Sequence, residues 1–167
     1  MKHTIIYFIG VYDTLDLFTG KLREAFETMG YASFVYDARL PQSKDALLSV
    51  LAESSSPERE FSCVTFNNLG YNLDMEVPAP AQSVRENDAC IQKGGTRNVI
   101  PYLNILMDHP FHYEKPLRLA PETSVVLCTD RNHVKYIRRY FKNIHQVDFL
   151  PHAGVELGSR HKPLAER

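Results

Sequence analysis

The 167-residue sequence lacks a hydrophobic run long enough to cross a membrane and lacks an excess of either charge. The apolar run at residues 5–10 is far shorter than the roughly 20 residues that a membrane-spanning helix needs, and no small-residue cleavage site follows it. With 19 basic and 20 acidic side chains, the chain has no general attraction for nucleic acid or anionic lipid. We therefore expect a cytoplasmic protein with no integral membrane segment and no nucleic-acid partner.

Cysteine is scarce, and its spacing matches no common metal or disulfide pattern. The three cysteines, Cys63, Cys90 and Cys128, form no CxxC pair, so neither a disulfide framework nor a zinc ribbon is indicated. We expect Cys63 and Cys128 to be reduced and to pack as small apolar residues inside strands.

Short apolar segments alternate with segments of helical periodicity along the chain. The pattern predicts strands at 4–9, 31–36, 61–66, 102–107, 124–129 and 146–150. It predicts helices at 16–29, 43–54, 81–93 and 132–141, with Ser43 as a possible cap and Gly30 as a helix end. Prolines bar 73–80 from a central strand or helix. Such alternation is typical of an α/β fold, here a Rossmann-like, open, mostly parallel sheet of about six strands with helices on both faces. We expect one domain over 1–154, and a tail or the start of an interdomain linker over 155–167.

Polar residues follow the ends of five predicted strands. In open parallel sheets ligands bind beyond the carboxyl ends of the strands, so we expect these side chains to line one site. The candidates are Gly10, Tyr12, Asn67, Asn68, Asp108, His109, His112, Tyr113, Asp130, Arg131, His133 and His152.

The first two clusters each allow a structural and a functional interpretation. No second or third glycine follows Gly10 at the spacing of a GxGxxG motif, which favours a turn over a phosphate cradle. The amides of Asn67 and Asn68 could bind a sugar, because each offers a donor and an acceptor. They could equally serve the turn itself, since asparagine tolerates left-handed backbone.

The segment 108–113 has the densest chemistry, with one carboxylate and two imidazoles. Asp108 or His109 could act as a general base toward a hydroxyl group. The alternative is that Asp108 caps the next element and His112 packs or faces solvent. Arg131 begins a basic helix, where it could meet an anion or form part of a solvated or partner-docking face.

Metal chemistry is the competing interpretation of the Asp and His residues at the strand ends. Their spacing is not HExxH, and Pro110 breaks any helix that would place His109 and His112 on one face. We therefore expect no metal ion.

Three segments, at 104–113, 126–137 and 149–154, resemble the amino-terminal half of bacterial GT-B-type glycosyltransferases, in particular the CgeB-like (spore-maturation) branch. The similarity spans about residues 5–154, while 77–96 fits the family pattern poorly. GT-B enzymes have two Rossmann-like domains across a cleft, the first holding the acceptor and the second the nucleotide-sugar. The resemblance implies an acceptor-side domain that looks like half an enzyme and is inactive alone.

The resemblance also implies roles for the candidate residues. An inverting transfer would need Asp108 or His109 as base, and a retaining transfer would need no separate base in this half. The other candidates would bind the substrate. The implied partners are a carbohydrate or other hydroxyl acceptor and a carboxy-terminal donor-binding domain, with a nucleotide-sugar as substrate and no cofactor. The alternatives are a stand-alone α/β ligand-binding or regulatory module and a metal-dependent hydrolase that uses the Asp and His residues.

Overall fold

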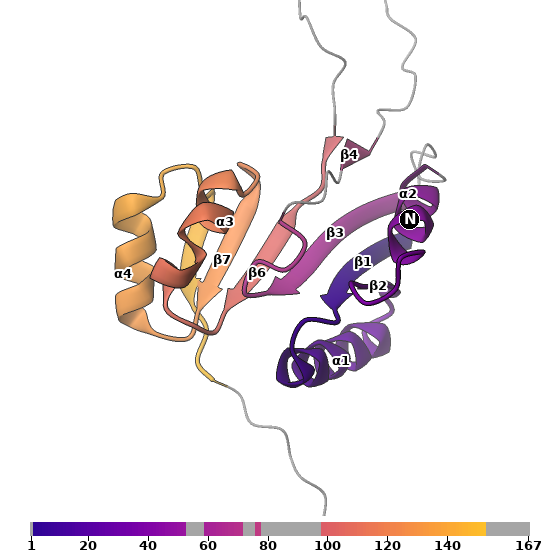
Figure 1. Ribbon diagram of the computed structural model, residues 1–167, viewed down its shortest axis with the longest axis horizontal. Coiled ribbons are helices and arrows are strands. Elements are labelled where there is room, and N and C mark those ends of the chain that lie inside the picture. Colours follow the sequence, from indigo (N-terminus) through magenta and orange to yellow (C-terminus); the bar gives the residue numbers. More distant parts are fainter. Residues whose placement is uncertain (1, 53–58, 72–75, 78–97, 153–167) are drawn as a thin grey trace, which may run out of the picture.

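A computed structural model of the chain describes residues 2–52, 59–71, 76–77 and 98–152. Six parallel strands form one sheet in the order β2-β1-β3-β6-β7-β8 (Figure 1). These strands are β1 (Lys2–Ile9), β2 (Ala32–Asp37), β3 (Arg59–Phe66), β6 (Tyr102–Leu106), β7 (Ser124–Cys128) and β8 (Gln146–Phe149). The predicted open parallel α/β sheet is confirmed.

The helices are α1 (Asp13–Thr28), α2 (Ser43–Ala52), α3 (Glu114–Leu119) and α4 (Arg131–Tyr140), with a short 3-10 helix, η2 (Pro110–Tyr113), before α3. A separate antiparallel pair joins β4 (Glu76–Val77) to β5 (Asn98–Val99). The expected helix at 81–93, Cys90 and the expected tail at 155–167 lie outside the described residues.

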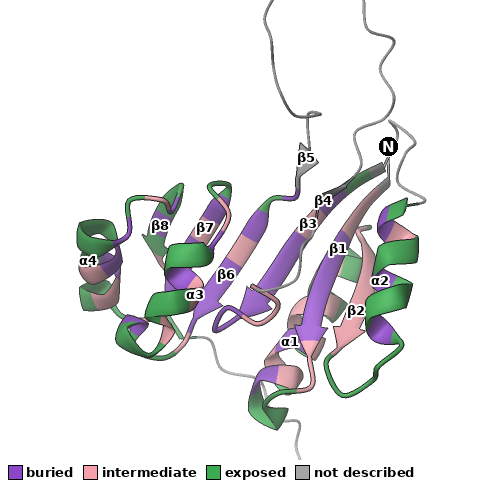
Figure 2. Cartoon of the chain, turned by 45° about the horizontal axis from the view of Figure 1, so that its top comes forward, coloured by how far each residue is buried: buried purple, intermediate pink, exposed green. Residues whose placement is uncertain are grey.

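The centre of the sheet is buried on both faces, as the apolar run in β1 predicts. Ile6 and Tyr7 point to opposite faces of β1, and both are fully buried. Ile6 pairs in register with Phe34 of β2 and with Cys63 of β3. Figure 2 shows β1, β3 and β6 largely buried and the edge strand β2 only partly so.

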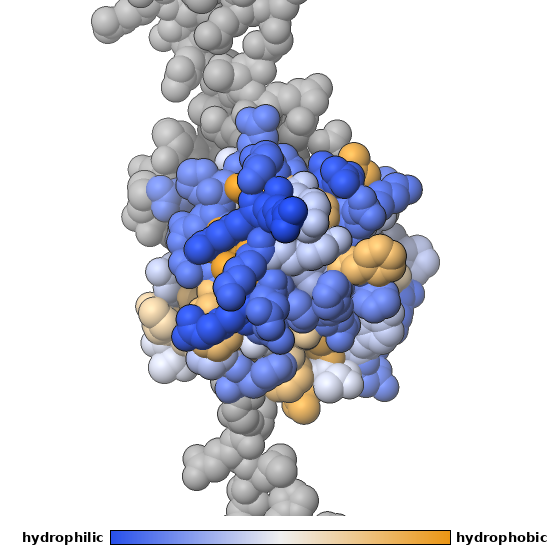
Figure 3. Space-filling model, turned by 90° about the vertical axis from the view of Figure 1, so that its left-hand side faces the viewer, coloured by the Kyte–Doolittle hydropathy of each residue, from blue (hydrophilic) through white to orange (hydrophobic). Residues whose placement is uncertain are grey.

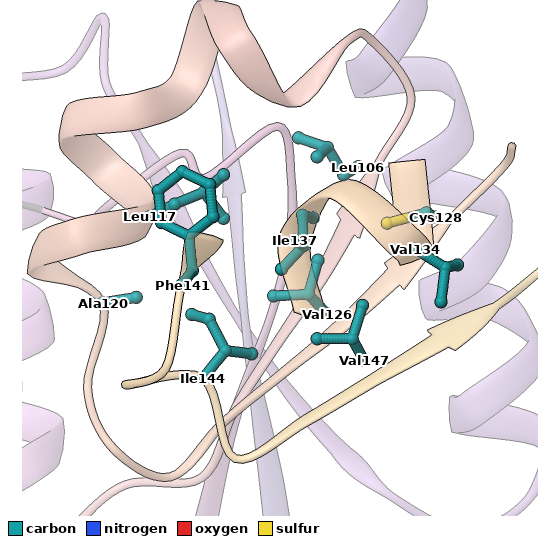
Figure 4. Packing of buried hydrophobic residues seen from close by; sticks show 10 residues of the cluster. All are labelled: Leu106, Leu117, Ala120, Val126, Cys128, Val134, Ile137, Phe141, Ile144 and Val147. Atoms are coloured by element: carbon teal, nitrogen blue, oxygen red, sulfur yellow. The ribbon is translucent and has the colours of Figure 1, made fainter. Parts of the chain in front are cut away.

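Helices cover both faces, and each face has its own core. On one face Leu22 and Phe26 of α1 pack against Ile5, Tyr7 and Val64. On the other face α2 packs against alternate residues of β1, β3 and β6. The helices α3 and α4 cover β6, β7 and β8 on that second face (Figure 4). Because alternate residues of β6 contribute to both of these cores, α2, α3 and α4 lie on the same side of the sheet.

Local chemistry explains how α1 ends and how α2 begins. At the end of α1, Gly30 has a φ of +92°; its N–H donates to Glu27 O, and the N–H of Tyr31 donates to Phe26 O. This is the Schellman arrangement, so the predicted helix end is confirmed. Ser43 does not cap α2 from outside; it is the first helical residue, and its hydroxyl accepts a hydrogen bond from Asp37 N–H at 3.3 Å.

The α1 helix begins at Asp13, earlier than the expected residue 16. Asp13 and Asp16 both lie in its first turn, where negative side chains stabilise the free N–H groups of a helix start. Within the described part of the chain, no helix is both long enough and apolar enough to cross a membrane.

The two described cysteines occupy strands, as expected. Cys63 in β3 and Cys128 in β7 are fully buried, and burial raises the pKa of each thiol to about 12. At neutral pH both therefore remain protonated and pack as apolar groups.

We expect Cys63 and Cys128 to resist Ellman's reagent at pH 8 in the folded Cys90→Ser variant and to react quickly after unfolding in urea. The thiolate is the reactive form, and folding raises the pKa of both thiols. The free energy that the two buried, protonated thiols contribute to folding is fully present below the thiol pKa of the unfolded chain, about 8.5. This contribution is lost as the pH rises from there toward the thiol pKa of the folded chain. Rapid reaction of the native variant would contradict the burial of these strands.

Gly70 provides a sharper test of packing, because it has a φ of +79° and a Cβ there would meet the Phe8 ring at 2.5 Å. We expect Gly70→Ala to lower the free energy of unfolding by about 2–4 kcal/mol, through left-handed strain and overpacking. Gly20→Ala is the matched control, since its Cβ would meet nothing within 4 Å and Gly20 lies inside α1. For that variant we expect the free energy of unfolding, measured in urea, to rise by up to about 1 kcal/mol. Equal effects of the two substitutions would contradict the close approach of Gly70 to Phe8.

Candidate functional site

The strand order places a crevice between the carboxyl ends of β1 and β3. From β1 the chain moves outward to β2, whereas from β3 it moves the other way to β6, so the connections diverge at this point. Open α/β sheets bind ligands at such a divergence. A pocket of about 450 Å³ lies there, and we call it the β1/β3 pocket.

Aromatic and amide side chains dominate the lining of the β1/β3 pocket. The aromatic residues are Phe8, Tyr12, Tyr36, Tyr71 and Tyr113, and the other polar lining residues are Asn67, Asn68 and His112. Among the described residues that line it, none is Lys, Arg, Asp or Glu. The pocket therefore presents flat apolar surfaces and a few polar groups.

Asn67 and Asn68 form a left-handed turn after β3, with φ values of +50° and +58°. The Asn67 side chain ties this turn to the end of β6. Its Oδ1 accepts hydrogen bonds from Met107 N–H at 2.8 Å and Asp108 N–H at 3.4 Å, and its Nδ2 donates to Asp108 Oδ2 at 2.8 Å. For Asn67 the turn interpretation therefore accounts for the whole side chain.

Asn68 differs from Asn67, because its amide is not used by the turn. Its side chain is 1% exposed and lines the pocket, and its backbone N–H donates to Asn104 Oδ1 at 2.9 Å. Its own Oδ1 and Nδ2 are buried without a hydrogen-bond partner among the described residues, as is Nδ2 of Asn104. Buried amides normally find partners, so this pair is unusual.

Asp108 follows β6 and is held from two sides. Its Oδ2 accepts hydrogen bonds from Asn67 Nδ2 and, at 3.0 Å, from the Tyr113 hydroxyl, and within the described chain its Oδ1 accepts none. Burial, followed by the hydrogen bond to Asp108 and its negative charge, raises the pKa of Tyr113 above the usual tyrosine range. Tyr113 therefore stays protonated and keeps donating, and Asp108 presents one oxygen for another partner.

His109, rather than Asp108, caps the element that follows. His109 Nδ1 accepts a hydrogen bond from Phe111 N–H at 3.1 Å at the start of η2. With Nδ1 as acceptor, the neutral ring carries its proton on Nε2 and can only donate from there. The ring also packs edge-on against His133, with centroids 4.8 Å apart, and against Tyr136. Burial lowers the pKa of His133, an effect that the charge of Asp130 opposes.

Two further candidates have structural partners on the α4 side of the molecule. Asp130 caps α4 by accepting a hydrogen bond from Asn132 N–H at 2.6 Å. The guanidinium of Arg131 lies 4.1 Å from the centroid of the Phe149 ring. Figure 3 looks at this side and shows a surface where hydrophilic side chains predominate.

The remaining two candidates lie in different places. Gly10 has a φ of +96°, and its N–H donates to Asp16 Oδ1 at 2.9 Å. A carboxylate thus occupies the position where a phosphate would bind, which supports the turn interpretation of Gly10. His152 lines a second groove of about 340 Å³, beside α1 on the opposite face, with Leu22 and Leu150.

The structure therefore brings together part of the predicted set. All the candidates follow the carboxyl ends of parallel strands, but only some reach one pocket. Those that line the β1/β3 pocket or bond to its lining are Tyr12, Asn67, Asn68, Asp108, His112 and Tyr113. Asp130, Arg131, His133 and His152 do not, and no group of three or more His, Cys, Asp or Glu in the described part of the chain could hold a metal ion.

The sequence interpretation missed Asn104 and the aromatic walls of the pocket. Asn104 is fully buried inside the apolar strand β6, and a lone amide in such a strand was the available signal. Phe8 and Tyr36 are the residues opposite each other in β1 and β2, so they share a face, but their role depends on the strand order. Searches against protein-family models, curated proteins and solved structures returned no match.

We expect Asn67→Gly to lower the free energy of unfolding by about 1–3 kcal/mol, because three hydrogen bonds to the end of β6 are lost. Glycine keeps the left-handed backbone, so Asn67→Ala should cost about 1 kcal/mol more. Urea unfolding of both variants measures the two effects separately. A glycine variant as stable as the original chain would show that Asn67 does not tie β3 to β6.

Proposed function

We propose that this chain is the acceptor-side domain of a GT-B-type glycosyltransferase. In this proposal, the β1/β3 pocket binds a carbohydrate or another hydroxyl acceptor, and a carboxy-terminal domain supplies the nucleotide-sugar. The observation that carries the proposal is the position of Asp108. Its carboxylate is held by two residues that line the pocket, and its Oδ1 is left available for a proton.

The lining of the pocket supports an acceptor of this kind. Aromatic rings offer flat apolar surfaces, and sugar rings have apolar C–H faces that pack on them. The hydroxyl groups of a sugar require donors and acceptors, which Asn68, His112 and the tyrosines can supply. Because no cationic side chain of the described chain lines the pocket, a diphosphate has no counter-charge there.

The chemistry assigned to Asp108 is general-base catalysis of an inverting transfer. The acceptor oxygen forms a new bond to the anomeric carbon of the donor sugar as its proton passes to Asp108 Oδ1. The bond between that carbon and the phosphate oxygen breaks, and the nucleoside diphosphate leaves with the electron pair. Asn67 and Tyr113 orient the carboxylate for this step.

Asp108 suits the base role better than His109. The free nitrogen of a neutral His109 ring carries a proton when Nδ1 accepts from Phe111 N–H, so that nitrogen cannot accept another. Neither residue lines the pocket itself, but the side chain of Asp108 is hydrogen-bonded to the side chains of two residues that do, Asn67 and Tyr113.

A stand-alone ligand-binding module is the second candidate function, and the same pocket favours it. Such a module would bind its ligand without any transfer, so the two functions differ in whether Asp108 matters to a reaction. No observation favours the metal-dependent hydrolase.

We expect Asp108→Asn to lower the rate of sugar transfer roughly 100-fold or more, because the amide cannot take the acceptor proton. The assay follows transfer by the chain supplied with a donor-binding domain, and calorimetry measures acceptor affinity in parallel. Affinity should change little, since the pocket lining is intact, and His109→Ala should retain transfer. Nucleotide-sugar binding by this chain alone, lost in His109→Ala, would contradict the acceptor-side assignment.

A further inference from the structure

Asn68 has an unusual side chain. Its backbone is left-handed, with a φ of +58°, which asparagine tolerates, but both polar atoms of its buried side chain lack a partner among the described residues. Unpaired buried polar groups are rare and call for an explanation, of which a functional role is one. The Asn67 side chain and the Asn68 backbone N–H hold the turn against β6 and the residues after it, so the side-chain amide of Asn68 is not needed to hold this part of the fold.

The side chain of Asn104 in β6 holds the turn that Asn67 and Asn68 form after β3. Its Oδ1 accepts the Asn68 backbone N–H at 2.9 Å, and its Nδ2 is likewise buried and unpaired. Two neighbouring buried asparagines thus leave a donor and an acceptor on Asn68 and a second donor on Asn104. A ligand that satisfies the Asn68 amide must offer an acceptor and a donor side by side.

The charges near the pocket restrict the ligand further. Asp16 and Asp37 lie beside the first turn and share Arg39, which binds Asp37 at 2.8 Å and Asp16 at 3.5 Å. Asp108 adds a carboxylate that is bonded to Asn67 of the pocket lining. Because Arg39 is already paired with two carboxylates and no Lys or Arg is among the described residues that line the pocket, the pocket favours a neutral ligand over an anion.

We infer that Asn68 is the residue that determines ligand specificity in the β1/β3 pocket, by binding two adjacent hydroxyl groups of a neutral sugar. One hydroxyl donates to Asn68 Oδ1 and the other accepts from Nδ2. Tyr12, which is 57% exposed at the pocket, provides a surface for the apolar face of the sugar ring. The inference deepens the proposed function, since it rests on the pocket being the acceptor site.

The test is calorimetry and saturation-transfer NMR with methyl glucopyranoside, compared with tetrahydropyranylmethanol, which keeps the ring and lacks the adjacent hydroxyls. Asn68→Gly retains the left-handed backbone and deletes the amide, and Asn68→Asp retains the shape and loses the donor. We expect the glucoside to bind the original chain and to bind both variants about 10-fold more weakly or worse. The thermal midpoint of Asn68→Gly should stay within a few degrees, because no hydrogen bond to the chain is lost.

Tyr12→Ala should also weaken glucoside binding, whereas Tyr140→Ala, a matched exposed tyrosine on α4, should not. Glucoside binding that is equal in Asn68→Gly would overturn this inference and leave the proposed function standing. If tetrahydropyranylmethanol binds the original chain as tightly as the glucoside does, this inference is also overturned and the proposed function still stands. If uridine or adenosine binds more tightly than the glucoside, or if no probe binds, both the Asn68 inference and the proposed function are overturned.

Discussion

The Asn67 side chain joins the end of β3 to the end of β6, and the geometry of the candidate site depends on this connection. The two strands already run parallel in register, with Phe66 opposite Ile105. Beyond the last pair the backbone of β3 must turn, and two consecutive left-handed residues allow it to do so. The hydrogen bonds of Asn67 to Met107 and Asp108 hold the two chain segments together at that point. They also orient the Asp108 carboxylate and position Asn68 on the pocket wall.

The two faces of the sheet have different chemistry at the same edge. On the face covered by α2, α3 and α4, the β1/β3 pocket combines aromatic rings with amides, and two of its lining residues, Asn67 and Tyr113, bond to Asp108. On the α1 face, the groove near Leu150 and His152 is mostly apolar. A polar ligand finds hydrogen-bond partners mainly in the first of these. Asp130 caps α4, and Arg131 packs on the Phe149 ring of β8. The candidate site therefore lies toward the β1 and β3 side of the sheet.

The fold could be predicted from the sequence, because the apolar strands and amphipathic helices are local patterns with clear periods. The six parallel strands follow from continuous apolar runs such as 5–9, and the end of α1 follows from Gly30. The site could be predicted only in part. The sequence shows that Asp108 and His152 both follow strands, but the face that each side chain reaches depends on strand order and on the turn after each strand. The capping role of Asp130 is compatible with its place just before a predicted helix, but the tautomer of His109 depends on a single hydrogen bond with no sequence signature.

The central claim is that the β1/β3 pocket binds a neutral polyhydroxyl ligand through the unpaired Asn68 amide. The most direct measurement is a two-dimensional ¹H–¹⁵N NMR titration of the full chain with methyl glucopyranoside, following assigned side-chain amide signals. We predict that the Asn68 side-chain signals shift in a saturable manner, while those of Asn143, which does not line the pocket and whose Nδ2 donates to Leu117 O, do not. Unchanged Asn68 signals, with shifts confined to the groove beside α1, would contradict the account.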